Sequence, residues 1–220
     1  MRQRNVKNQE EILNACDRYV TVPESLKGKW KGTYDGIYLE IGIGKGQFIY
    51  NKAIQNPNIL FVGIELNKGV IALATKKIKR LEEESGGVRA DNLRLFAYDA
   101  SKLQDVFENG EVDKIYLNFS DPWPKKKHEK RRLTSTAFLN IYKEILNNKG
   151  VIEQKTDNRS LMEYSIMSYN KNKAIIDDIS LNVYEDIKSL KLQDNVATEY
   201  EEKFREKRPI YKIVVRLGGE

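Results

Sequence analysis

The sequence has few of the residues that form disulfide bonds or bind metal ions. Its 220 residues include one cysteine, Cys16, and one histidine, His128. A single cysteine excludes an intramolecular disulfide and a zinc site made of several cysteines. Because Cys16 falls in a helical pattern of apolar residues, we expect a packed thiol and not a nucleophile. The sequence therefore predicts no metal centre.

Long hydrophobic runs are also absent. No segment approaches the roughly 20 consecutive apolar residues of a membrane span, and residues 1–11, MRQRNVKNQEE, lack the apolar core of a signal peptide. We therefore expect a cytoplasmic protein without membrane contact. The sequence contains neither an internal repeat nor a low-complexity linker, so its length favours one α/β domain with a modest extension.

Charge is segregated along the chain. The net charge is +6, but residues 177–202 hold eight acidic residues and two lysines, which leaves +12 for the rest. A positive field attracts phosphate backbones by releasing counterions, although it carries no sequence information. This distribution is compatible with a nucleic-acid partner.

Residues 1–36 are expected to form an N-terminal extension. Basic residues near the start, Arg2 and Arg4, precede a pattern that predicts a short helix from about Gln9 to Tyr19. The first residues can be an ordinary frayed terminus or an arm that contacts RNA, and the former is favoured.

A glycine-rich turn separates a predicted strand from a predicted helix. Residues 37–41 form a buried apolar run that contains Glu40, and Gly42, Gly44 and Gly46 follow before a helical pattern begins. Glycine lacks the Cβ that would keep the backbone away from a ligand, so units of this kind bind nucleotide-like molecules. The position of the glycines between strand and helix gives weight to an otherwise common pattern.

Acidic residues stand at the ends of four predicted strands. The strands are residues 59–65, 93–97, 113–119 and 151–155, and the acids are Glu65, Asp99, Asp121 and Asp157. Glu65 lies 19 residues after Gly46, the spacing at which an acid accepts hydrogen bonds from ribose hydroxyls. Because the carboxyl ends of parallel strands meet at one edge of a sheet, we expect these acids to lie together there.

Helical patterns separate these strands, at about residues 70–81, 138–146 and 160–169. Alternating strands and helices predict a parallel, doubly wound α/β sheet. For the helix at 138–146, Thr134 or Ser135 is the expected N-cap and Gly150 the expected end. Residues 175–184 and 211–217 are predicted to form two closing strands in a partly antiparallel hairpin.

The segment Asn118–Leu133, NFSDPWPKKKHEKRRL, joins a stiff loop to a basic run. Pro122 and Pro124 fix φ and remove two backbone donors, which stiffens the loop that presents Asp121. Six of the eight residues 125–132 are Lys or Arg. A basic run alone leaves nucleic-acid contact and plain solvation equally open, but its attachment to a strand end favours a bound substrate. We expect the run to be an exposed arm.

These motifs resemble those of a known enzyme class. Glu-Ile-Gly-x-Gly-x-Gly after the first strand, in a seven-strand α/β pattern, resembles the class I S-adenosylmethionine-dependent methyltransferases. Further motifs look like those of the bacterial tRNA (guanine-N7)-methyltransferase family. They are Gly63-Ile64-Glu65, Asp121-Pro122-Trp123-Pro124-Lys125-Lys126, Lys130-Arg131-Arg132-Leu133, Thr156-Asp157-Asn158 and the segment from Thr198 to Phe204. The likeness covers residues 37–220, the expected methyltransferase domain. It implies a Rossmann-like, doubly wound, mostly parallel sheet of seven strands whose last strand is antiparallel.

The resemblance implies a site for S-adenosylmethionine and a site for tRNA. The implied cofactor residues are Glu40, Gly42, Gly44 and Gly46 for the methionine part, Glu65 for the ribose, and Asp99 with Ala100 for the adenine. Asp121 would face both the cofactor and the guanine as the catalytic residue. The implied substrate residues are Lys125, Asp157, Thr198, Glu199, Tyr200 and Glu201. The implied tRNA contacts are Lys126, Lys127, His128, Lys130, Arg131 and Arg132.

The implied reaction is methyl transfer to N7 of a guanine in the variable loop of tRNA, at position 46. Guanine N7 carries an in-plane lone pair, so no general base is needed, and a chain with one histidine is compatible with the reaction. Asp121 has the sign required to stabilise the positive charge that passes to the purine. Two departures from the family pattern are Lys127, where arginine is common, and residues 205–209, where a glycine is usual.

Two other functions are compatible with parts of the sequence. Methyltransferases that act on amino groups of DNA bases or of protein glutamine also place a Pro-containing loop after the fourth strand, although the order Asp-Pro-Trp-Pro and the basic run argue against them. An RNA-binding module without activity is the second alternative, which the intact Glu40 and Glu65 disfavour. The chain can act as a monomer or a homodimer.

Overall fold

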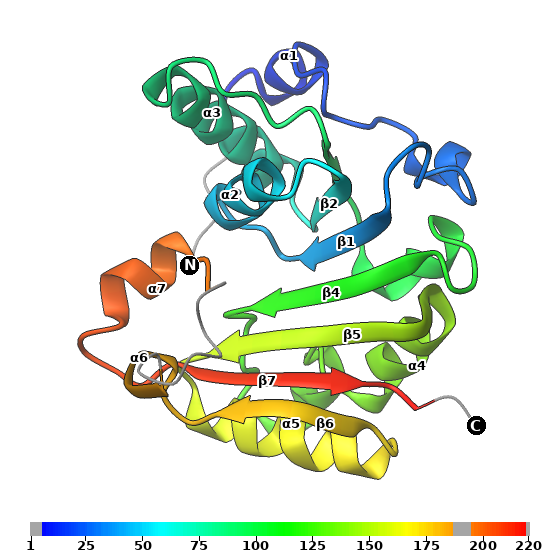
Figure 1. The fold of residues 1–220 in the computed structure, drawn as a ribbon, viewed down its shortest axis with the longest axis vertical. Helices are drawn as coiled ribbons and strands as arrows, with labels where there is room; N and C mark the ends of the chain where they lie inside the picture. The colour runs from blue at the N-terminus through cyan, green and yellow to red at the C-terminus, as the bar shows by residue number, and fades with distance from the viewer. Residues whose placement is uncertain (1–5, 187–194, 219–220) are drawn as a thin grey trace.

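A computed structural model describes residues 6–186 and 195–218. Its centre is a seven-stranded sheet (Figure 1). The strands are β1 Gly36–Ile41, β2 Ile59–Glu65, β3 Leu93–Ala97, β4 Val112–Asn118, β5 Leu146–Thr156, β6 Ile175–Ser180 and β7 Tyr211–Arg216. Their order is β3-β2-β1-β4-β5-β7-β6, and β7 runs antiparallel to its neighbours β5 and β6 while the other pairs are parallel. The predicted seven-stranded sheet with an antiparallel last strand is confirmed.

Helices lie on both faces of the sheet. The α-helices are α1 Gln9–Asn14, α2 Gln47–Gln55, α3 Lys68–Glu84, α4 Thr136–Ile145, α5 Arg159–Lys171, α6 Val183–Asp186 and α7 Glu199–Phe204. Short 3-10 helices are η1 Pro23–Leu26, η2 Ala100–Asp105 and η3 Lys126–Arg131. In Figure 1, α4 and α5 lie behind the strands, whereas α2 and α3 lie at the β1–β2 end on the other side. No helix within the described residues is long and apolar enough to cross a membrane.

Two hydrophobic cores correspond to these two faces. One packs Tyr142 of α4 and Tyr169 of α5 against the sheet, and both tyrosines are fully buried. The other packs Phe48 of α2 and Ile71 of α3 against Phe61. Because both faces are covered, the central strand β1 is buried almost throughout, and its sequence is apolar apart from Glu40.

The helix predicted from Gln9 to Tyr19 is wrong in its second half, since α1 ends at Asn14. The following residues instead extend the edge of the sheet. The Leu95 N–H donates to the Arg18 carbonyl at 2.8 Å, and the Val20 N–H donates to the Leu95 carbonyl at 2.8 Å. Pairing with β3 therefore takes the backbone groups that a longer helix would have used.

Two further boundaries differ from the prediction. Gly150 does not end α4, because the helix stops at Ile145 and β5 begins at Leu146 with Gly150 inside it. The predicted strand 175–184 ends at Ser180, since Val183 packs against Ile210 and begins α6. Ser135 is the N-cap residue of α4, but its side chain makes no capping hydrogen bond.

Parts of two predicted segments lie outside the described residues. These are the basic residues Arg2 and Arg4, and residues 187–194 of the acidic stretch 177–202. The described part of the N-terminal extension packs on the domain, because Trp30 is buried and its ring stacks on Phe96 with centroids 5.5 Å apart.

Candidate active site

The glycine turn between β1 and α2 leaves open space at the end of the sheet. Gly42 has φ 82° and Gly44 has φ 54°, in the left-handed region that favours glycine. A Cβ added at either residue would meet no atom within 4 Å. Gly46 differs, because a Cβ added there would lie 3.1 Å from Cδ1 of Ile78 in α3. The first two glycines can therefore admit a ligand, and the third serves packing.

Beneath this turn lies a buried carboxyl group, Glu40, with 2% of its surface exposed. Its Oε1 accepts a hydrogen bond from Asn118 Nδ2 at 2.9 Å, but Glu40 Oε2 and Asn118 Oδ1 have no partner among the described residues. Burial raises the pKa of Glu40 to about 8, against the opposing effects of Asn118 and Lys155. Two buried acceptors without a donor fit a cationic amino group. Sequence reasoning did not select Asn118.

Glu65 lies at the end of β2 and faces the turn. Its carboxylate accepts hydrogen bonds from the Leu66 N–H at 3.0 Å and the Gly44 N–H at 3.4 Å. Burial raises the pKa of Glu65, and the nearby carboxylate of Asp121 adds to the increase. The structure thus brings together two acids that are 56 positions apart.

The residues predicted to hold an adenine lie beside Glu65. The Tyr98 N–H donates to the Glu65 carbonyl at 2.9 Å, which joins the end of β3 to the end of β2. Asp99 then caps η2, and its side chain accepts the Ser101 N–H at 2.9 Å. Ala100 is the first residue of η2.

The loop after β4 presents Asp121 to solvent and holds a constrained backbone. Phe119 has φ 50° and Trp123 has φ 42°, which is uncommon for residues with a Cβ. Arg132 fixes the loop by donating to the carbonyls of Pro122 and Trp123, each at 3.0 Å. The side chain of Asp121 is exposed.

The predicted exposed arm is wrong for part of the basic run, because the run folds back as η3. The Arg132 guanidinium lies 4.2 Å from the centre of the Tyr164 ring, and that of Arg131 lies 4.9 Å from the Trp123 ring. His128 is half-buried and contacts Trp123 edge-on. Ring contacts thus hold both guanidinium groups, and the carbonyls of Pro122 and Trp123 hold that of Arg132. The residues that remain exposed are Lys125, Lys126, Lys127, Lys130 and Arg131.

A second polar group forms where β5 ends. Asp157 Oδ2 accepts hydrogen bonds from the Tyr200 hydroxyl and from Arg208 Nη1, both at 3.0 Å. The Tyr200 ring packs against Phe119, with centroids 4.8 Å apart. The loop after β4 therefore lies near both groups, because Asp121 raises the pKa of Glu65 and Phe119 packs on Tyr200 beside Asp157.

Helix α7 brings the remaining predicted substrate residues to the same edge. It begins with a capping box in which Thr198 Oγ1 accepts the Glu201 N–H and Glu201 Oε2 accepts the Thr198 N–H. Glu199 pairs with Lys45 of the glycine turn at 2.7 Å. Glu201 is fully buried.

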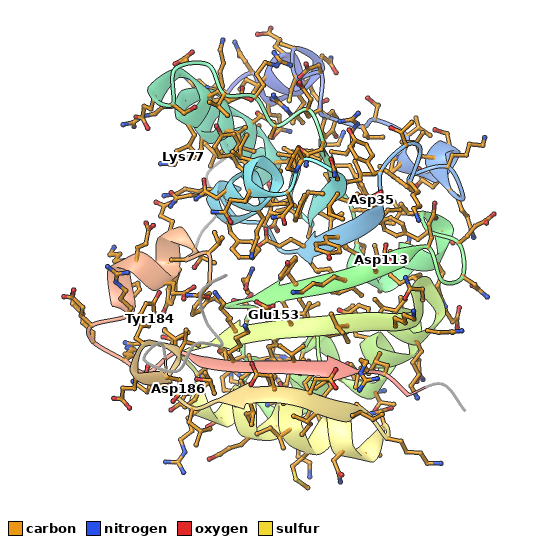
Figure 2. The ribbon with its side chains drawn as sticks, viewed as in Figure 1. Asp35, Lys77, Asp113, Glu153, Tyr184 and Asp186 are labelled. Carbon is orange, nitrogen blue, oxygen red and sulfur yellow. The ribbon has the colours of Figure 1, made fainter. Side chains whose placement is uncertain are left out.

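Sequence reasoning missed Lys155, the last residue but one of β5. Its side chain is 1% exposed and pairs with Glu201 Oε2 at 3.1 Å. The available signal was the occurrence of Glu153 and Lys155 two positions apart, on one face of an otherwise buried strand. Figure 2 shows Glu153 on the central strands and Tyr184, another partner of Glu201, at the edge where β4 and β5 end.

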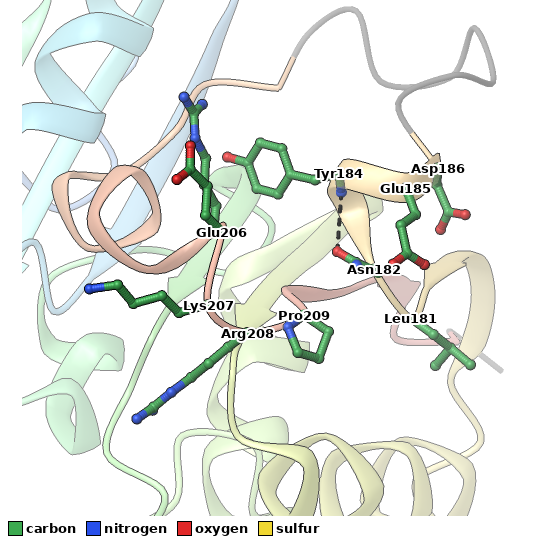
Figure 3. A pocket seen from close by; sticks show the side chains of 10 residues that line it. Leu181, Asn182, Tyr184, Glu185, Asp186, Glu206, Lys207, Arg208 and Pro209 are labelled. Carbon is green, nitrogen blue, oxygen red and sulfur yellow. Dashed lines mark hydrogen bonds between the residues drawn. The ribbon is translucent and has the colours of Figure 1, made fainter.

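A cavity of about 630 Å³ lies next to the group around Asp157, between residues 181–186 and residues 205–209 (Figure 3). Arg208 belongs to both, since it lines the cavity and pairs with Asp157. The remaining lining includes acids and bases, so its charge selects no one class of ligand. No group of three or more His, Cys, Asp or Glu residues in the described ranges could hold a metal ion.

Sequence comparison places the chain among methyltransferases. A family profile described as "Putative methyltransferase" matches residues 35–213. The tRNA (guanine-N(7)-)-methyltransferase of Bacillus licheniformis is 46% identical over 88% of each chain. The enzyme of that name from Bacillus subtilis strain 168 is 46% identical over 93% of this chain and 92% of its own length. The enzyme of that name from Streptococcus uberis is 45% identical over 97% of this chain and 98% of its own length.

Solved structures agree in fold at much lower identity. The 16S rRNA methyltransferase KamB superposes with a TM-score of 0.60 at 15% identity, over 87% of this chain and 92% of its own. The 16S rRNA (adenine(1408)-N(1))-methyltransferase of Catenulisporales acidiphilia superposes with a TM-score of 0.60 at 14% identity, over 90% of this chain and 94% of its own. These two likenesses show the fold alone. The identity shared with the bacterial relatives over nearly the whole length, as the motifs predicted, shows that this chain belongs to the tRNA (guanine-N7)-methyltransferase family.

Proposed function

We propose that this protein transfers the methyl group of S-adenosylmethionine to N7 of a guanine in tRNA. The observation that carries the proposal is the position of the Asp121 loop between two groups. Asp121 raises the pKa of Glu65 on one side, after the larger effect of burial, and Phe119 packs on Tyr200 on the other. A group that must face both a methyl donor and a base requires this placement.

The cofactor side fits S-adenosylmethionine. The acceptors Glu40 Oε2 and Asn118 Oδ1 would take the amino group of its methionine part, and the open turn at Gly42 and Gly44 would lie against it. Glu65 would bind the ribose hydroxyls. Asp99 and Ala100 would border the adenine. When bound, S-adenosylmethionine supplies a sulfonium methyl group to the guanine.

On the substrate side, Asp121 orients the guanine and offsets the charge that it gains. Its carboxylate would accept hydrogen bonds from N1 and N2 of guanine, whereas adenine lacks both donors. No proton leaves N7, so the reaction needs no general base, and His128 need not act as one. The other residues that form the substrate site in this proposal are Lys125, Asp157, Thr198, Glu199, Tyr200 and Glu201, the last of which is fully buried and supports the site from within.

Delivery of the tRNA falls to the basic segment, defined as residues 125–132. Its exposed lysines would contact phosphates, which positions the substrate without choosing the base. We assign the variable-loop guanine at position 46 as the target, residues 37–220 as the methyltransferase domain after the 1–36 extension, and the cytoplasm as the location. The protein would act as a monomer or a homodimer.

Nucleoside mass spectrometry tests the proposal. Unmodified tRNA transcript is incubated with the protein and S-adenosylmethionine, then digested and compared with a transcript that carries adenine at position 46. We expect 7-methylguanosine from the first transcript and none from the second. Methyl groups on an exocyclic amine, or no methyl transfer by a protein that binds S-adenosylmethionine, would contradict the proposed reaction.

A further inference from the structure

We infer that Lys155 is a positioning residue. By pairing with Glu201, it holds helix α7 in the position in which Glu199 and Tyr200 face the substrate site. The inference rests on the proposed function, because it assigns a role within the same substrate site. Its support is the pattern of contacts around two buried charges, those of Lys155 and Glu201.

The ammonium group of Lys155 has no donor left for a ligand. It donates to Glu201 Oε2 at 3.1 Å and Oε1 at 3.4 Å, to the Val196 carbonyl at 3.1 Å and to Asn195 Oδ1. An ammonium group has three N–H donors, so these acceptors use all of them. Burial lowers the pKa of Lys155, and the Glu201 carboxylate opposes that effect.

The carboxylate of Glu201 is equally occupied. Besides Lys155, it accepts hydrogen bonds from the Tyr184 hydroxyl at 2.8 Å, from Asn195 Nδ2 at 3.2 Å and from the Thr198 N–H at 3.2 Å. A carboxylate offers about four acceptor positions. In this arrangement Glu201 influences a bound guanine by placing its neighbours and not by contact.

Those neighbours are the residues that face the site. Glu199 reaches Lys45 of the glycine turn, and Tyr200 reaches Asp157. Helix α7 has six residues, which is too short for stability without an anchor. Its buried anchor is the pair Lys155–Glu201, so this pair sets the register in which Glu199 and Tyr200 point toward the site.

Lys155 also connects α7 to the cofactor side. Its Nζ lies 5.8 Å from the centre of the Phe48 ring in α2. Among the charged and polar groups around Glu40, which include Asn118, Glu65 and Tyr116, Lys155 is the cation that favours the ionised form. One buried side chain therefore contacts the elements that carry both halves of the site.

The test uses Lys155→Met, which keeps a similar length and removes the charge. We expect kcat for tRNA methylation to fall about 100-fold, because small displacements of substrate-positioning groups have effects of that size. KM for tRNA should change less than about threefold, since phosphate contacts dominate affinity. Amide hydrogen exchange should accelerate in residues 199–204 and not in the central strands. The matched control is Lys114→Met, which breaks the 2.8 Å pair with Glu153 on the same sheet and should leave kcat near that of the wild type.

A double-mutant cycle tests whether Lys155 acts through Glu201. The variant Lys155→Met/Glu201→Gln should be no slower than the slower single variant. If the two reductions in kcat multiply in the double variant, the residues act independently and the inference is overturned. An unchanged kcat in Lys155→Met would overturn it as well. If Lys155→Met does not fold, Lys155→Met with Glu201→Leu replaces the pair by apolar groups, a change often tolerated. That double variant should fold and still show fast exchange in residues 199–204, and full protection there would refute the anchor. Exchange rates do not depend on methylation, so they separate this inference from the proposed function.

Discussion

Single residues decide the chemistry of this site through burial and charge. Glu40 and Asp121 are both acids at the same edge of the sheet, but Glu40 is 2% exposed and Asp121 is open to solvent. A buried carboxyl group without a full set of donors favours its neutral form or a cationic partner, whereas an exposed carboxylate can meet a ligand that arrives from solvent. This difference supports the proposal that Glu40 binds the cofactor and that Asp121 faces the developing charge on guanine.

Asp121→Ala is expected to slow methyl transfer by roughly 10²–10³-fold, because it removes the group aimed at the developing positive charge. Affinity for tRNA should change less than about twofold, since phosphate contacts supply most of it. Single-turnover methylation and equilibrium tRNA binding measure the two effects. Unchanged turnover would remove Asp121 from the catalytic assignment, and Asp121→Asn serves as the shape-preserving comparison.

Tyr142→Phe is expected to stabilise the protein by about 1 kcal/mol, because the Tyr142 hydroxyl is buried and has no partner among the described residues. Its matched control is Tyr169→Phe. The Tyr169 hydroxyl donates to Gln154 Oε1 at 3.1 Å, so its loss should destabilise by about 1 kcal/mol. Urea unfolding compares both with the wild type, and equal effects of the two substitutions would show that hydrogen bonding does not distinguish these sites.

At the scale of elements, the basic segment and α7 have different tasks. The basic segment keeps most of its cations exposed, while Arg132 is used to hold the Asp121 loop. Helix α7 exposes Glu202 and Lys203, but its Glu201 is fully buried and anchors it. In the proposed function, long-range delivery of the tRNA and short-range positioning of the guanine thus fall to separate elements.

Replacing the exposed cations Lys126, Lys127, Lys130 and Arg131 by glutamine is expected to weaken tRNA binding and reduce the slope of log K against log salt by about 3. Arg132 is retained so that the loop stays in place. The control removes the same charge from α3, at Lys76, Lys77, Lys79 and Arg80, and should reduce the slope less. A basic-segment variant with the wild-type slope would show that the segment is only solvated surface.

At the scale of the whole molecule, the candidate site is a junction between two halves of the sheet. Glu40 comes from β1, Glu65 from β2, Asn118 from β4 and Lys155 from β5. Placing acids at such a junction makes the stability of the fold depend on pH and on the cofactor.

We expect the stability of the ligand-free protein to fall with rising pH because of Glu40. Its pKa is raised from 4.5 to about 8 in the folded state, so between these values the folded chain holds one proton more than the unfolded chain. The contribution is complete below pH 4.5 and is lost as the pH rises through 8, with a slope of up to about 1.4 kcal/mol per pH unit.

Urea unfolding of the wild type and of Glu40→Gln between pH 5 and 8.5 measures this effect as a difference. The wild type should lose stability relative to Glu40→Gln as the pH rises. S-adenosylmethionine should reduce this loss, because a cationic amino group favours the ionised Glu40. A difference between the two proteins that is independent of pH would contradict the buried, proton-binding state.

The sequence determined the order of strands and helices, the glycine turn and the acids at the strand ends. It could do so because periodicity, glycine and proline act on their own and adjacent residues. These local signals are enough to predict that Glu65, Asp99, Asp121 and Asp157 lie at one edge of the sheet. The alternation of apolar residues in 211–217 predicts a partly antiparallel closing strand, and the resemblance implies the same for the last strand.

Only the tertiary structure decided how far α1 extends, that the basic run folds back, and which polar groups are paired. Tyr19 leaves the helical pattern because β3 offers backbone partners 76 positions away. Asn118 meets Glu40 across 78 positions, and Lys155 meets Glu201 across 46. Such partners come from strands and helices that meet only after folding. Their burial, and with it the charge state of Glu40, depends on packing that no local pattern encodes.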